Sequence, residues 1–146
     1  MKPVLLALMF LSEEHIAQMA QTFEVIYAPD APQAATAIAQ HGSRVRVVLT
    51  IGAVGLSPAQ IDALPALTLI CALGAGYENV AVDHAKARGI VVATGAGTND
   101  DCVADHTWGL LIAAQRRILP LDKATRAGVW RTALPLPPNV SHKRLG

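Results

Sequence analysis

The sequence predicts an α/β protein with a doubly wound, parallel sheet of five strands, followed by long interdomain helices. Three observations support this fold class. Short apolar runs alternate with helix-like segments, several of those runs lack the apolar–polar alternation of half-exposed strands, and 52% of the 146 residues are hydrophobic. A chain of this length can bury a substantial core, and its charged fraction of 16% excludes intrinsic disorder.

The five expected strands are short and mostly apolar. They span Val4–Met9, Val25–Tyr27, Val45–Leu49, Leu67–Ala72 and Ile90–Ala93. Strands that alternate with helices along a chain form parallel sheets through right-handed crossovers. Five such strands suit the flavodoxin-like order 2-1-3-4-5. Because several runs are apolar throughout, we expect helices to cover them on both faces.

Helix-start signals lie between these strands. Ser12 can cap a helix that opens with two glutamates, whose charges suit a helix amino end. Ser57 and the residues after it combine a capping box with proline at the first helical position. A further helix is expected over Ala81–Arg88, because Gly89 is a favourable residue just after a helix end.

The pattern changes after residue 98. Asp100–Arg117 predicts one helix of about 18 residues, roughly 27 Å long, with acidic residues in its first turns and arginines in its last. We expect Pro120 to break it and Leu121–Ala127 to form a second, shorter helix. Residues Ala133–Ser141 resemble a linker, and the Leu-Gly at 145–146 resembles the start of another strand.

The net charge of +1 predicts no nucleic-acid partner and no attraction to a membrane surface. Residues 100–146 hold seven of the 12 Lys and Arg residues, a series we interpret as a solvated or subunit-facing surface. The run Val4–Leu11 favours a buried strand over a signal peptide, because glutamates follow it at once. Cys71 and Cys102 form no CxxC motif, which is compatible with a reducing, cytoplasmic location.

Three glycine-containing loops follow the third, fourth and fifth expected strands, where doubly wound sheets bind ligands. Glycines let backbone N–H groups surround an anion, so Gly74–Gly76 can hold a carboxylate or phosphate, or can simply form a tight turn. That loop and Gly95–Gly97 each begin like a dinucleotide fingerprint but lack its third glycine; Asn79 and Asp100 stand there instead. No spacing predicts a metal site.

Four segments together resemble one enzyme family. They are LICALGAGYENV at 69–80, VD at 82–83, ARGIVV at 87–92 and DCVADH at 101–106. Their order and spacing resemble the D-isomer-specific 2-hydroxyacid dehydrogenases, and most closely the glyoxylate and hydroxypyruvate reductases, through essentially the whole chain. The resemblance implies hydride transfer between NAD or NADP and C2 of a small 2-oxo or 2-hydroxy acid.

The resemblance also implies binding residues. Backbone N–H groups of the loop after the fourth strand would hold the substrate carboxylate, and a residue of the long helix would face the nicotinamide. Asn99 stands where many members have an apolar residue, so it either contacts substrate or caps the helix. The implied substrate-binding residues are Leu73, Gly74, Ala75, Gly76 and Asn99, and the cofactor-binding residue is Val103.

Family enzymes are about twice as long as this chain, which implies a division into parts. We expect a substrate-binding domain over 1–98, interdomain and dimerisation helices over 99–132, and a linker with the start of an NAD(P)-binding Rossmann domain over 133–146. The family's catalytic Arg, Glu and His are expected beyond residue 146, so no residue here is assigned a catalytic role. The 146 residues alone are expected to be inactive and to form a homodimer through the 100–117 helix.

Two alternatives stay open at this point. One is a stand-alone flavodoxin-like module that binds small acids or a protein partner without catalysis. The other is a different member of the same family, such as a formate or phosphoglycerate dehydrogenase, because Asn99 is compatible with a formate-type site.

Overall fold

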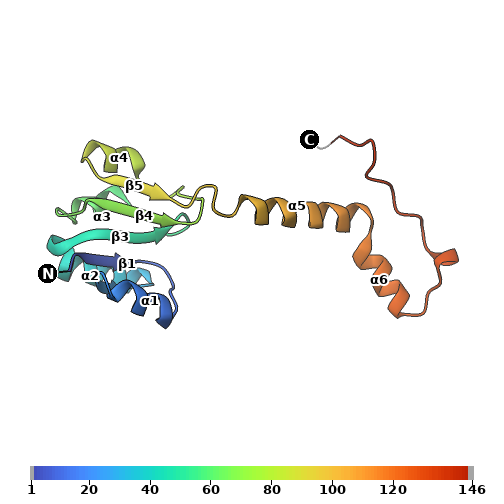
Figure 1. Cartoon of the computed structure of the whole chain (residues 1–146), viewed down its shortest axis with the longest axis horizontal. Coiled ribbons are helices and arrows are strands. Elements are labelled where there is room, and N and C mark those ends of the chain that lie inside the picture. Colours follow the sequence, from blue (N-terminus) through green and yellow to red (C-terminus); the bar gives the residue numbers. More distant parts are fainter. Residues whose placement is uncertain (1, 145–146) are drawn as a thin grey trace. The chain divides into compact units, whose positions relative to one another are not determined.

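The computed structural model describes residues 2–144, which divide into two compact units between Thr98 and Asn99. The first unit carries the whole sheet and its connecting helices (Figure 1). Its elements are β1 (Val4–Ala7), α1 (Glu13–Ala20), β2 (Glu24–Tyr27), α2 (Ala31–His41), the 3-10 turn η1 (Gly42–Arg44), β3 (Val45–Ile51), α3 (Pro58–Asp62), β4 (Leu69–Leu73), α4 (Val82–Ala87) and β5 (Val91–Thr94).

The sheet has five parallel strands in the order β2-β1-β3-β4-β5, which confirms the predicted fold class and strand order. Figure 1 shows β1, β3, β4 and β5 side by side. All five expected strands are present, with ends displaced by one or two residues. The β3–β4 pairing is the longest continuous register, from Val47↔Leu69 to Ile51↔Leu73.

The core lies on one face of this sheet. Leu6, Val48 and Ile70 are neighbours in register on β1, β3 and β4, and each is 0% exposed. Helices α2, α3 and α4 cover them with small and branched side chains, among them Ala37 and Ile61. Burying one such aliphatic side chain contributes about 1.5–3 kcal/mol.

The other face is covered unevenly within the first unit. All four residues of β1 are buried, as the apolar run predicts, but β4 alternates between buried and half-buried residues and Val91 on β5 is 61% exposed. Right-handed crossovers explain the difference. The chain passes in one direction from β2 through β5, which places α2, α3 and α4 on one face, and only the reverse step from β1 to β2 places α1 on the other.

The helix-start signals explain where the connecting helices begin. The Ser12 side chain accepts a hydrogen bond from the His15 N–H, and Ser57 forms the predicted capping box with Gln60. We do not predict helix α2 from the sequence, although its start carries the same kind of capping signal. Asp30 Oδ1 accepts from the Gln33 N–H at 2.8 Å, and a proline lies in the first turn.

The second unit contains α5 (Asp100–Gln115), α6 (Ile118–Arg126) and the 3-10 turn η2 (Arg131–Ala133). The expectation that Pro120 breaks the long helix is wrong. The break lies at Arg117, whose φ of 54° is left-handed, and Pro120 sits in the first turn of α6, where its missing N–H costs nothing. Residues 134–144 have no regular structure, and the strand expected from 145 onward lies outside the described residues.

Two properties of the helices bear on environment and association. Within residues 2–144, no helix combines the length and apolar character that crossing a bilayer requires. Helices α5 and α6 bury none of their own residues, so the apolar side chains of α5 remain largely exposed. The acidic residues at the start of α5 match the polarity of a helix amino end, as predicted.

The uneven cover of the sheet predicts unequal effects of one substitution on stability. Val48→Ala should lower the free energy of unfolding by about 2 kcal/mol, because it removes two buried methyl groups and leaves a cavity. Val91→Ala, at a position 61% exposed, should change it by less than about 0.5 kcal/mol. Urea denaturation followed by circular dichroism measures both, and equal losses would contradict the assignment of the core to one face.

Candidate functional site

Three loops meet at the carboxyl edge of the sheet, where β3, β4 and β5 end. Backbone hydrogen bonds join them. The Gly95 N–H donates to the Gly74 carbonyl at 2.7 Å, and the Asn79 N–H donates to the Gly52 carbonyl at 3.3 Å. The β4 loop therefore lies between the other two and contacts both.

The β4 loop is the predicted binding loop. Leu73 ends β4, and Gly74 turns the chain with a φ of 89°, a conformation that a side chain would strain. The N–H groups of Ala75 and Gly76 donate to no acceptor among residues 2–144, and both residues are exposed. Two adjacent free donors at the end of a parallel strand are suited to hold one carboxylate.

Gly52 lets the β3 loop approach this binding loop closely. A Cβ added at Gly52 would lie 2.6 Å from the carbonyl carbon of Gly76, a distance that real Cβ atoms do not reach. The contact involves backbone, which cannot rotate away. Any larger residue at position 52 would displace the part of the loop that carries the free N–H groups.

Glu78 adds a negative charge at the same place. Its Oε2 lies against Gly76, since a Cβ added there would be 2.6 Å from that oxygen. The side chain is exposed, so water screens its charge, but a charge at such short range still acts on a ligand. This carboxylate disfavours a ligand with a second negative charge beside the loop. Glu78 was not among the residues predicted from the sequence, because no motif there depends on it.

Asn79 ties the binding loop to the β3 loop. Its side-chain Nδ2 donates to the Ala53 carbonyl at 3.1 Å, and its own carbonyl accepts from the Leu56 N–H at 3.0 Å. The buried Thr50 hydroxyl donates to the Gly55 carbonyl at 2.9 Å and so links the end of β3 to the loop that follows it. From the sequence, Asn79 is identified only as the residue that replaces the third glycine of a dinucleotide fingerprint. The signal that could have indicated its structural role is a side-chain amide next to a glycine-rich turn.

The two remaining predicted site residues belong to the second unit. Asn99 occupies the N-cap position of α5, with φ −130° and ψ 14°; its carbonyl accepts from the Val103 N–H at 2.9 Å, and its side chain makes no capping hydrogen bond. Val103 lies in the second turn of α5 and is 54% exposed. The structure thus brings Leu73, Gly74, Ala75 and Gly76 together in one loop, and places Asn99 and Val103 in the other unit.

The titratable side chains of the described residues provide no metal site. No group of three His, Cys, Asp or Glu side chains in residues 2–144 is arranged to hold a metal ion. Burial raises the pKa of the Cys71 thiol, which keeps it in the protonated, weakly nucleophilic form at neutral pH. We therefore interpret Cys71, which lies on β4, as a packing residue.

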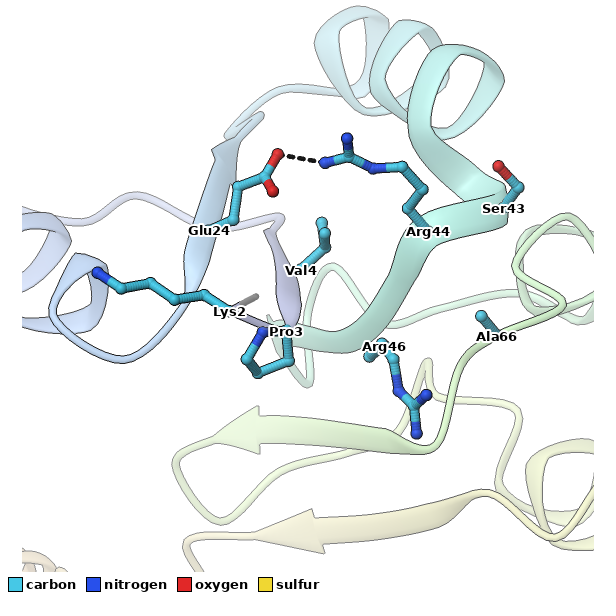
Figure 2. Close-up of a pocket in the computed structure, with 8 residues that line it drawn as sticks. All are labelled: Lys2, Pro3, Val4, Glu24, Ser43, Arg44, Arg46 and Ala66. Carbon is cyan, nitrogen blue, oxygen red and sulfur yellow. Dashed lines mark hydrogen bonds and ion pairs between the residues drawn. The ribbon is translucent and has the colours of Figure 1, made fainter.

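A hollow of about 610 Å³ lies at the opposite, amino edge of the sheet (Figure 2). Three cationic side chains line it, but they do not converge. Arg44 forms an ion pair with Glu24, the Lys2 ammonium donates to the Ala20 carbonyl at 2.6 Å, and Figure 2 shows Arg46 pointing away from both. This hollow therefore offers no adjacent, unpaired donors of the kind that the binding loop presents.

Comparison with known proteins places this geometry in a family. The family model described as "D-isomer specific 2-hydroxyacid dehydrogenase, catalytic domain" matches residues 5–135. A 2-ketogluconate reductase of Gluconobacter oxydans is 36% identical over 103 residues, which cover 70% of this chain and 33% of that protein. A glyoxylate reductase of Thermococcus kodakarensis is 39% identical over 70 residues, 48% of this chain and 21% of the relative.

Solved structures agree with the sequence comparison. The 2-hydroxyacid dehydrogenase from Ketogulonicigenium vulgare superposes with a TM-score of 0.84 at 30% identity, over 95% of this chain and 44% of that one. The NADPH-dependent glyoxylate/hydroxypyruvate reductase from Sinorhizobium meliloti, solved with NADP and malonate, has a TM-score of 0.80 at 28% identity, over 99% and 44%. This chain thus spans less than half the length of these relatives. It belongs to the D-isomer-specific 2-hydroxyacid dehydrogenase family, and residues 5–135 match the family's catalytic domain.

Proposed function

We propose that this chain binds the carboxylate of a small 2-oxo acid, as the substrate-binding part of an NAD(P)-dependent D-2-hydroxyacid dehydrogenase. The observation that carries the proposal is the pair of free N–H groups on Ala75 and Gly76. Leu73 and Gly74 shape the turn that presents them. The match of residues 5–135 to a 2-hydroxyacid dehydrogenase catalytic domain supports an acid as the ligand class.

Glyoxylate and hydroxypyruvate are the substrates we propose, and Glu78 is the reason. Each has one carboxylate and an uncharged remainder, so neither brings a second negative charge to the Glu78 carboxylate beside Gly76. Two unit charges 4 Å apart repel by about 1 kcal/mol in bulk water and by more near a protein surface. The reductases named among the relatives are consistent with this choice.

The role of this chain in the reaction follows from which molecule, the acid or the cofactor, its residues can bind. A bound nicotinamide would supply the hydride. The Gly74–Gly76 and Gly95–Gly97 loops do not fit a dinucleotide, because both lack the third glycine and the Gly95 N–H, a donor that a pyrophosphate would need, already donates to the Gly74 carbonyl. This chain's own residues bind and orient the acid. We propose Asn99 as a further substrate contact, Val103 as a contact on the cofactor side, and the cytoplasm as the location.

Titration with oxamate tests acid binding directly. Oxamate carries the carboxylate and adjacent carbonyl of a 2-oxo acid in unreactive form, so the amide signals of Ala75 and Gly76 should shift and saturate in ¹⁵N-labelled protein. Gly52→Ala should weaken the affinity at least about tenfold, because its Cβ displaces the Gly76 backbone. Gly109→Ala is the matched control, since a Cβ there meets nothing within 4 Å. Unshifted loop signals at high millimolar oxamate would refute the proposal.

A turnover assay on the chain alone tests whether these residues lack the catalytic groups of the reaction. The purified 146 residues should bind oxamate but should not oxidise NADH or NADPH in the presence of glyoxylate, since no described residue is assigned to hydride or proton transfer. Absorbance at 340 nm measures the reaction. Enzymatic oxidation above the background of heat-denatured protein would show that this chain contains a catalytic group we have not assigned.

Association through the long helix is the proposed quaternary contact. Trp108 and Leu110 on α5 are each 58% exposed, and α5 buries none of its residues, so a second copy could cover this helix. Trp108→Asp should convert a dimer to a monomer in light scattering coupled to size exclusion. Leu136→Asp is the control, because Leu136 is 94% exposed and lies outside the helix. A monomeric unsubstituted chain would contradict the proposal.

A further inference from the structure

Asn79 is joined to the β3 loop by three bonds that start from three different atoms. The backbone N–H reaches the Gly52 carbonyl, the backbone carbonyl accepts from Leu56, and the side-chain Nδ2 reaches the Ala53 carbonyl. Any residue except proline at position 79 could form the two backbone bonds. The Nδ2 bond alone requires the asparagine side chain.

We infer that Asn79 is a positioning residue for the acid site, and that its side chain holds the β3 loop where it supports the free N–H groups of Ala75 and Gly76. The inference rests on the proposed function, because it concerns the same loop. Asn79 itself touches no reacting atom; it acts through the neighbouring loop.

Gly52 connects Asn79 to the binding loop. The Gly52 carbonyl accepts from the Asn79 N–H, and the Gly52 Cα faces the Gly76 backbone at a distance that excludes a Cβ. The adjacent carbonyl, of Ala53, is the one the side chain holds. A shift of the 52–53 peptide would therefore move the surface on which Gly76 rests, and with it the direction of both free N–H groups.

The position of Asn79 separates this role from general stabilisation. The residue is exposed, so truncating it leaves the buried core of the first unit intact. A neutral hydrogen bond at such a site contributes little to global stability, but fixing a loop in its binding conformation lowers the entropic cost of binding. Loss of the side chain should thus affect affinity and loop order more than the unfolding midpoint.

The matched control lies at the other edge of the sheet. The Thr68 hydroxyl donates to the Arg46 carbonyl at 3.1 Å, which is also an exposed side-chain bond to a distant backbone carbonyl. Thr68→Val removes that bond near the start of β4 and leaves the three carboxyl-edge loops unchanged. Comparing it with Asn79→Ala separates the loss of one hydrogen bond from the loss of loop position.

The experiment measures oxamate affinity, amide ¹⁵N order parameters and urea midpoints of the 146-residue chain. Asn79→Ala should weaken oxamate binding about fivefold, as expected for one neutral hydrogen bond, and lower the order parameters of Ala75 and Gly76. Asn79→Asp has the same shape but puts a carboxylate oxygen opposite the Ala53 carbonyl, and should lower those order parameters at least as much. Thr68→Val should leave affinity and loop order unchanged.

The outcomes separate this inference from the proposed function. If the unsubstituted chain binds oxamate but Asn79→Ala binds it equally well with unchanged loop order, the positioning role is wrong and the acid site stands. Equal weakening by Asn79→Ala and Thr68→Val also overturns the role, because the effect then reflects general stability. If the unsubstituted chain binds no oxamate, the acid site fails and there is nothing for Asn79 to position.

Discussion

The parallel register of β3 against β4 determines where every candidate binding group of the first unit lies. Five consecutive pairs end at Ile51↔Leu73, so both strands stop at the same height and their loops leave the sheet side by side. The contact between Gly52 and Gly76 and the bonds of Asn79 all follow from this alignment. A slip of one residue would turn the buried side chains of β4 to the other face, so the core itself maintains the geometry of the loops.

Charge and hydrogen bonding act in opposite directions at the loop. The free N–H groups of Ala75 and Gly76 attract an anion, whereas the Glu78 carboxylate against Gly76 repels one. An acid with one carboxylate can place it on the donors and turn its uncharged end toward Glu78. Selectivity for small acids then arises from neighbouring groups of opposite polarity, with no need for a deep cavity.

The sequence correctly predicts those parts of the structure that depend on residues close together in the chain. Ser12 and Ser57 act where capping chemistry places them, and the apolar runs indicated the strands and their order. Pro120 was misinterpreted because a proline can begin a helix as well as end one. The binding loop could be found from its glycines, but Asn79 acts through the β3 loop, 26 residues away from it at Ala53. This hydrogen-bond partner of Asn79 can be identified only when the pairing of β3 with β4 is known.

Because the sheet is covered unevenly, the protection of its amide hydrogens from exchange with solvent should differ from strand to strand. Both faces of β1 are buried, whereas β5 is an edge strand with Val91 largely exposed. Amide hydrogens should therefore exchange slowly in β1 and faster toward β5, through local openings that leave the centre folded. The β4 and β5 loops lie on the side of faster exchange. A ligand held there would be bound by the part of the sheet that opens most readily, and its binding should slow exchange at that edge.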